Sequence, residues 1–200
     1  MNNPKLNLNP ITNKNHKEGI MSKADREERK KKVIDVLNKA RAMELQAIHQ
    51  YMNQHFNVDD MDYGELAVKL KLIAIDEMRH SEQFAERIKE LGGEPTADPI
   101  GPIEKRQKVE VVYKFDADKE EDTVDDYNAF LKVCNENGDS ISAKLFETII
   151  DEEQIHYNYF NNIAEHIANL GNTFLANIAG TSSASGLQPS GFVISQQTQA

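Results

Sequence analysis

The chain has 200 residues, no tryptophan, only 10 glycines and 6 prolines, and a formal net charge of −10. This length suits a single domain, and the many Ala, Leu, Glu and Lys residues favour helix over strand. The negative charge argues against nucleic acid as a partner, because binding phosphates requires a basic surface.

Membrane and redox signals are also missing from the sequence. No run of about 18 apolar residues occurs, so no membrane partner is expected. The polar N-terminus lacks the apolar segment of a signal peptide, and we expect a cytoplasmic protein. Cys134 is the only cysteine, which excludes an intramolecular disulfide and a CxxC-type zinc or rubredoxin site. Cys134 is therefore expected to be a small buried residue.

The first part of the chain is expected to be a disordered extension followed by a long helix. Residues 1–21 are polar and rich in asparagine, and Met21 is an alternative start of translation. Ser22 is expected to be the N-cap of a helix. Apolar residues then recur at steps of three and four, the period of a helix: Val33, Val36, Leu37, Ala40, Met43, Ala47, Ile48 and Tyr51. The pattern fades at residues 57–64, which predicts a turn.

The rest of the chain contains signals for three more long helices. Gly92-Gly93 is a typical helix stop, and the segment VEVVYKF (109–115) has the composition of a strand. The expected segments are a helix from about Asp60 to Leu91, a crossover over 92–117, a helix from about Asp116 to 135–138, a helix from Asp139-Ser140 to Leu170, a short fifth helix over 172–179, and a flexible uncharged tail over 181–200.

Connections in the order short, long, short define the expected topology. A long middle connection lets the second and third helices run parallel, as in a ferritin-like four-helix bundle. We therefore predict an all-α fold with a ferritin-like domain over residues 22–180 and a short fifth C-terminal helix.

Two Glu-x-x-His motifs, Glu77-Met-Arg-His80 and Glu153-Gln-Ile-His156, suggest a metal site. Residues three apart in a helix lie about 60° apart around its axis, so each Glu and His share a face. The two motifs are 76 residues apart. This is the spacing expected if the chain is a duplicated helical hairpin.

Glu44 and Glu120 are also 76 residues apart, and they complete the pattern. In an antiparallel hairpin, two residues stand at the same level when the turn lies midway between them. The midpoint of Glu44 and Glu77 falls in the first expected turn, and the midpoint of Glu120 and Glu153 falls at 135–138. All six residues can therefore lie at one level of the bundle, which six unrelated surface residues would not explain.

Four carboxylates and two imidazoles are suitable ligands for two ions of intermediate hardness, such as iron or manganese. Buried carboxylates without partners are costly, and two divalent cations would neutralise four of them. Structural zinc is less suitable because it prefers cysteine and four ligands. A Glu from two helices and Glu-x-x-His from the other two is the arrangement of di-iron carboxylate proteins.

Three segments resemble the ligand-bearing motifs of the bacterioferritin family, and the resemblance covers about residues 25–180. They are LNKARAMELQAIHQYM (37–52), AIDEMRHSEQFAERI (74–88) and IIDEEQIHYNYF (149–160). The resemblance implies that Glu77 and Glu153 bridge two irons, that Glu44 and His80 complete one iron, and that Glu120 and His156 complete the other. Tyr51 would be a hydrogen-bond donor behind the ligands; an ordinary core tyrosine is the alternative.

Met78 has a separate role in this resemblance. It lies about 100° around the helix from Glu77, so it cannot share the metal-facing side. In bacterioferritins the methionine of this motif, one from each of two subunits, holds the iron of a haem or related iron-porphyrin. His16, His49, His55 and His166 have no matched partner and are given no role.

The function implied by the resemblance is iron storage and detoxification. Fe²⁺ would be oxidised by O₂ or H₂O₂ at a ferroxidase centre, and ferric mineral would be stored in a shell of 24 subunits built from haem-bridged dimers. A ferredoxin-type or flavin reductase is the expected partner for iron release. Two alternatives remain: a di-iron oxidase or rubrerythrin-like peroxidase without bulk storage, and a non-catalytic scaffold stabilised by metal.

Overall fold

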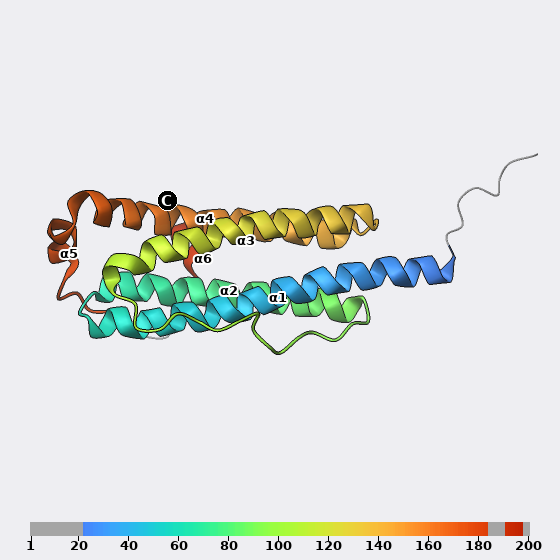
Figure 1. Cartoon of the computed structure of the whole chain (residues 1–200), viewed down its shortest axis with the longest axis horizontal. Coiled ribbons are helices and arrows are strands. Elements are labelled where there is room, and N and C mark those ends of the chain that lie inside the picture. Colours follow the sequence, from blue (N-terminus) through green and yellow to red (C-terminus); the bar gives the residue numbers. More distant parts are fainter. Residues whose placement is uncertain (1–21, 184–190, 198–200) are drawn as a thin grey trace, which may run out of the picture.

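The computed structural model describes residues 22–183 and 191–197, and within them all regular secondary structure is helical. Four long helices form two antiparallel hairpins that pack into one bundle, and two short helices follow (Figure 1). The helices are α1 (Lys23–Asp60), α2 (Gly64–Glu90), α3 (Val109–Glu136), α4 (Ser140–Leu170), α5 (Asn172–Ile178) and α6 (Phe192–Gln197). The expected all-α, ferritin-like bundle with a fifth helix is confirmed.

Several helix ends lie where the sequence predicts them, and each has a local cause. The Ser22 side chain accepts a hydrogen bond from the Asp25 N–H at 3.1 Å, and Asp25 accepts one from the Ser22 N–H in return. This capping box satisfies backbone donors at the start of α1. The Asp139 side chain caps α4 through the Ser142 N–H at 2.9 Å. Gly92 adopts a φ of 78° just after α2, a conformation that favours glycine.

The apolar core has two parts, separated along the bundle by a belt of buried charged residues. One part contains Tyr51, Leu70, Ile73, Tyr113 and Phe160, and lies toward the α1–α2 turn. The other lies toward the α3–α4 turn and contains Leu37, Phe84, Tyr127, Cys134 and Phe146. Cys134 is fully buried, as expected. Because both cores are apolar, the belt between them must neutralise its own charge.

The crossover between α2 and α3 runs back along α1, which holds it through side-chain hydrogen bonds (Figure 1). Asn38 donates to the Glu94 carbonyl at 3.1 Å and accepts from the Thr96 N–H at 2.7 Å. Gln50 both donates to the Glu104 carbonyl and accepts from its N–H, at 2.9 and 2.8 Å. The long connection therefore has a defined path on the outside of the bundle.

The expected start of the third helix was wrong. Residues 109–115 have the composition of a strand but form the first two turns of α3. Val109, Val112, Tyr113 and Asp116 are buried, at steps of three and four. Helical burial of this face outweighs the β propensity of its valines.

The first turn is also shorter than expected, because α1 continues to Asp60 and α2 begins at Gly64 instead of Asp60. Gly64 donates to the Thr181 carbonyl at 3.1 Å, and a Cβ at this position would lie 2.1 Å from the Ser183 nitrogen. The chain after α5 therefore packs on the α1–α2 turn.

The expected flexible tail over 181–200 is wrong for residues 191–197. Gly191, Phe192 and Val193 are buried, and α6 packs against α2 and α4 (Figure 1). The absence of charge in this segment allows it to lie against the bundle. The predicted extension over residues 1–21, with His16, lies outside the described residues, as do 184–190 and 198–200. In the described part of the chain, no helix has both the length and the apolar character needed to cross a membrane.

Candidate metal centre

The structure brings the six predicted ligands together in two groups that share two members. One group consists of Glu44, Glu77, His80 and Glu153, and the other of Glu77, Glu120, Glu153 and His156. Within each group, one possible ligand atom of every residue lies within 4.8 Å of the others. Glu77 and Glu153 belong to both groups, as two bridging carboxylates would. All six side chains are buried.

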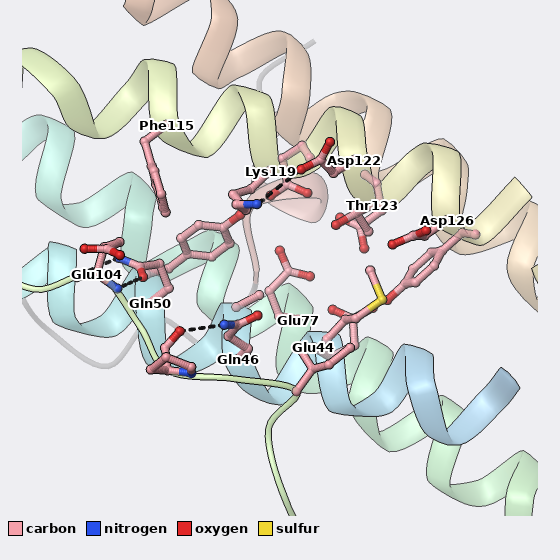
Figure 2. A pocket seen from close by; sticks show the side chains of 18 residues that line it. Glu44, Gln46, Gln50, Glu77, Glu104, Phe115, Lys119, Asp122, Thr123 and Asp126 are labelled. Carbon is pink, nitrogen blue, oxygen red and sulfur yellow. Dashed lines mark hydrogen bonds and ion pairs between the residues drawn. The ribbon is translucent and has the colours of Figure 1, made fainter. Parts of the chain in front are cut away.

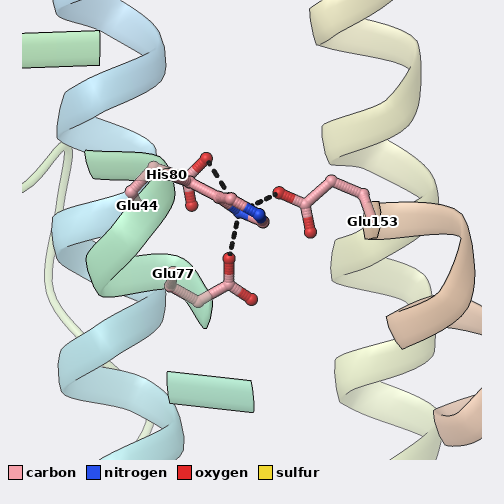
Figure 3. Close-up of side chains that lie close together, drawn as sticks. All are labelled: Glu44, Glu77, His80 and Glu153. Atoms are coloured by element: carbon pink, nitrogen blue, oxygen red, sulfur yellow. Dashed lines mark hydrogen bonds and ion pairs between the residues drawn. The ribbon is translucent and has the colours of Figure 1, made fainter. Parts of the chain in front are cut away.

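Both histidines turn their Nδ1 atom toward the shared carboxylates. His80 Nδ1 lies 3.0 Å from a Glu77 oxygen and 3.1 Å from a Glu153 oxygen, with Glu44 at 3.9 Å (Figure 3). His156 Nδ1 lies 3.0 Å from Glu153 and 3.2 Å from Glu77. Nδ1 is therefore the nitrogen available to a metal ion at each half of the site.

A second pair of carboxylates faces the other nitrogen of each ring. His80 Nε2 lies 3.0 Å from a Glu152 oxygen, and His156 Nε2 lies 3.5 Å from an Asp76 oxygen. A neutral histidine that donates its Nε2 hydrogen to such a carboxylate presents Nδ1 as a lone pair, in a fixed orientation. Asp76 and Glu152 thus select the tautomer that binds metal.

Two buried tyrosines donate to the two terminal glutamates, and each bond connects α1 with α3. Tyr51 on α1 donates to Glu120 on α3, and Tyr127 on α3 donates to Glu44 on α1. Each hydroxyl leaves its glutamate with a fixed orientation and one oxygen free for a metal ion. Burial, together with the charge of the neighbouring glutamate, raises the pKa of both tyrosines well above its usual range, so both are neutral donors.

Sequence analysis identified Tyr51 but missed Tyr127, Asp76 and Glu152. The 76-residue repeat contained the signal for all three. Tyr51 and Tyr127 are 76 residues apart, and so are Asp76 and Glu152. The repeat had been applied to the ligands but not to the residues that support them.

In the metal-free centre, protons neutralise the carboxylates. Burial opposes charging of His80 and His156, but the nearby glutamates outweigh it and raise the pKa of both rings well above the usual value. Burial and the charges of Glu153 and Glu77 raise the pKa of Glu44 and Glu120. Burial alone would raise the pKa of Glu153, yet the two imidazolium rings hold it below its ordinary range. Metal ions entering the site must displace these protons.

An acidic cavity of about 320 Å³ leads to the centre from the side formed by α1, α3 and the crossover. Glu77 lies at its inner end, and Gln46, Gln50 and Glu104 lie along the crossover side (Figure 2). Lys119 is its only basic lining residue among those described, and it pairs with Asp122 at 3.1 Å. The acidic lining residues are Glu44, Glu77, Glu104, Glu120, Asp122, Asp126 and Glu153. This charge favours cations over anions.

Met78 lies outside the centre, as its helical position predicts. Its side chain is 52% exposed, although Glu77 and His80 on either side of it are buried. His55 is buried and bonds through Nδ1 to the Ala67 carbonyl at 2.7 Å, whereas His49 and His166 are exposed. None of these three histidines contributes to the two ligand groups.

Comparison with known proteins agrees with this geometry. The ferritin-like domain family matches residues 34–170. Bacterioferritin from Desulfovibrio desulfuricans is 64% identical over 169 residues, which is 84% of this chain and 94% of that protein. Bacterioferritin from Brucella melitensis is 30% identical over 140 residues, which is 70% of this chain and 87% of that protein.

Solved structures give the same result. A crystal structure of the D. desulfuricans bacterioferritin, which concerns its di-iron site in different catalytic states, has a TM-score of 0.80 and covers 84% of this chain and 98% of that one. A Rhodobacter capsulatus bacterioferritin structure with a metal-free dinuclear site and haem iron has a TM-score of 0.73 at 28% identity, and covers 78% of this chain and 98% of that one. The resemblance expected from the ligand motifs is confirmed, and the chain belongs to the bacterioferritin family of ferritin-like proteins.

Proposed function

We propose that this chain oxidises Fe²⁺ at the centre formed by its four glutamates and two histidines, and that it stores the ferric product in an assembly of identical subunits. The observation that carries the proposal is the pair of ligand groups that share Glu77 and Glu153. Iron storage and ferroxidase activity are the functions of the bacterioferritin family, to which the chain belongs.

The ligand roles follow from the contacts within the centre. Glu44 and His80 would hold one Fe²⁺, Glu120 and His156 the other, and Glu77 and Glu153 would bridge them. Two ions with four carboxylates have no net charge, which makes burial between two apolar cores tolerable. Iron held as a pair supplies two electrons to O₂ or H₂O₂, so that one-electron radical products are avoided.

The surrounding residues bind, orient and admit the substrate. Tyr51 and Tyr127 fix the terminal glutamates, while Asp76 and Glu152 accept the Nε2 hydrogens of the histidines. The protons held by the metal-free centre leave as iron binds. The acidic cavity is the route by which we expect Fe²⁺ to reach Glu77 from the α1/α3 side.

The storage role is tested by iron retention. Fe²⁺ is added stepwise, in air, to the purified assembly, and the iron that co-elutes with protein on a sizing column is counted. Retention far above the two ions per subunit that the two ligand groups can hold, in a shell-sized peak, is the expected result. Retention that stops near two would contradict storage and favour a di-iron oxidase or rubrerythrin-like peroxidase.

We also propose that Met78 is the axial ligand of a haem shared by two subunits. Its exposed thioether lies on the helix flank away from the centre, where a second subunit can approach. A two-fold axis there supplies one methionine to each face of the porphyrin. The haem, when bound, would carry electrons for reductive release of stored iron, supplied by a ferredoxin-type or flavin reductase.

The haem proposal predicts that Met78→Leu abolishes haem binding. The purified assembly is expected to lose its porphyrin absorption, because leucine has no ligand atom. Met61→Leu, at the end of α1, is the matched control and is expected to retain it. Full haem content in the Met78→Leu protein would show that other residues hold the porphyrin. A shell of 24 subunits and a location in the cytoplasm complete the proposal.

A further inference from the structure

The α2/α4 side of the centre, opposite the cavity, is covered by the C-terminal segment Gly191–Val193. The Val193 N–H donates to Asp76 Oδ2 at 2.9 Å. Gly191 passes so close to the same carboxylate that a Cβ there would lie 1.6 Å from Asp76 Oδ1. The chain can reach Asp76 in this way only because residue 191 has no side chain.

Phe192 closes the same side of the centre with its ring. The ring centroid lies 6.3 Å from that of His156 and 4.9 Å from that of Tyr159. Lys69 Nζ lies over the outer face of the ring, 5.4 Å from its centroid. Phe192 is buried, so the ring excludes water from the neighbourhood of His156.

This cover makes the two halves of the centre unequal, although their ligands follow the 76-residue repeat. Asp76, which faces His156, is 2% exposed and is bonded by Arg79 at 3.0 Å as well as by Val193. Glu152, which faces His80, is 33% exposed. The Asp76–His156 pair is therefore held from the outside by the C-terminal segment, while the Glu152–His80 pair is open to solvent.

We propose that Gly191–Val193 is a positioning element for one half of the metal centre. By fixing Asp76 it fixes His156, so that a metal ion on Glu120 and His156 binds more tightly than one on Glu44 and His80. Outer partners of ligating histidines set their orientation and basicity, and their loss typically weakens metal binding about 10- to 100-fold. This inference rests on the proposed function, because it assigns the metal ions to the same six ligands.

The test is an anaerobic titration of the wild-type assembly with Co²⁺, followed by calorimetry. Two ions per subunit with unequal affinities are expected. Glu44→Ala and Glu120→Ala each remove one terminal ligand, and they assign each affinity to its half of the centre. In Gly191→Ala, the new methyl group displaces the segment from Asp76. The affinity of the His156 half should then fall about 10- to 100-fold, and that of the His80 half should be unchanged.

A second pair of variants separates the hydrogen bond from the packing. Val193→Pro removes only the N–H donor at a position in the first turn of α6, where proline is tolerated. Val193→Ala keeps the donor and shortens the side chain. Weakening of the His156 half in Val193→Pro, with wild-type binding in Val193→Ala and in the exposed control Ile194→Ala, supports the proposal.

Three results would overturn the inference, and they are distinguishable. Wild-type affinities in both Gly191→Ala and Val193→Pro would show that the segment does not position the site. Equal weakening of both halves would show that it supports the bundle as a whole. Absence of Co²⁺ binding in the wild-type protein would overturn the proposed function together with the inference.

Discussion

Glu153→Ala is expected to lower the initial rate of Fe²⁺ oxidation by at least about 100-fold, the upper end of what loss of an outer partner costs a metal site. Glu153 belongs to both ligand groups, and its two oxygens approach both histidines, at 3.1 and 3.0 Å. Its removal therefore weakens both halves at once and prevents the pairing of two irons. The rate is measured from the absorbance of the ferric product after Fe²⁺ is mixed with aerated protein.

The matched control for this prediction is Glu147→Ala. Glu147 is an exposed glutamate on the same helix, α4, and its loss should leave the oxidation rate at the wild-type level. Glu153→Gln keeps the size of the side chain but removes its charge, and it should resemble the alanine variant. A wild-type rate in both Glu153 variants would mean that iron is oxidised at another place in the protein.

The stability of the metal-free protein is expected to fall as pH rises from about 5 to about 9. The pKa of Glu44 and Glu120 is raised in the folded state, chiefly by burial, so the unfolded chain releases protons that the folded chain retains. The pKa of His80 and His156 is also raised, by the carboxylates around them. Their contribution is present below their ordinary pKa of 6.5 and is lost as pH rises through the higher folded value.

Glu153 acts in the opposite sense, because its lowered pKa contributes stability above 4.5 that is lost only in acid. Four groups therefore outweigh one over this pH range. Thermal unfolding followed by circular dichroism measures the effect, and a chain of this size loses about 2–4 °C in Tm for each 1 kcal/mol.

Two comparisons make the pH prediction specific to the centre. Two divalent ions replace the protons, so the difference in Tm between the metal-loaded and the metal-free protein should increase with pH. The double variant Glu44→Gln, Glu120→Gln imitates the protonated glutamates and should show a weaker dependence on pH. A Tm of the metal-free wild-type protein that rises between these pH values would refute the proposed protonation of the centre.

The ligand set could be predicted from the sequence because helices convert spacing into position. A Glu-x-x-His motif places both side chains on one face, and a residue's distance from the turn sets its level in a hairpin. The turns lie at residues 61–63 and 137–139, close to the midpoints of the two glutamate pairs. The first core, the second core and the belt between them follow from the same arithmetic. Tyr127, Asp76 and Glu152 could have been found by the same repeat.

The tertiary structure decided the features that depend on which surfaces meet. VEVVYKF has the local preference of a strand, and only burial of Val112 and Tyr113 against the bundle makes it helical. The position of the C-terminal segment is likewise invisible in the sequence, because an uncharged stretch rich in Ser and Gly has no periodicity that would predict a partner. Contact of Gly191 and Val193 with Asp76 requires a close approach between residues more than one hundred positions apart. That contact, and not the repeated ligand pattern, makes the two halves of the centre unequal.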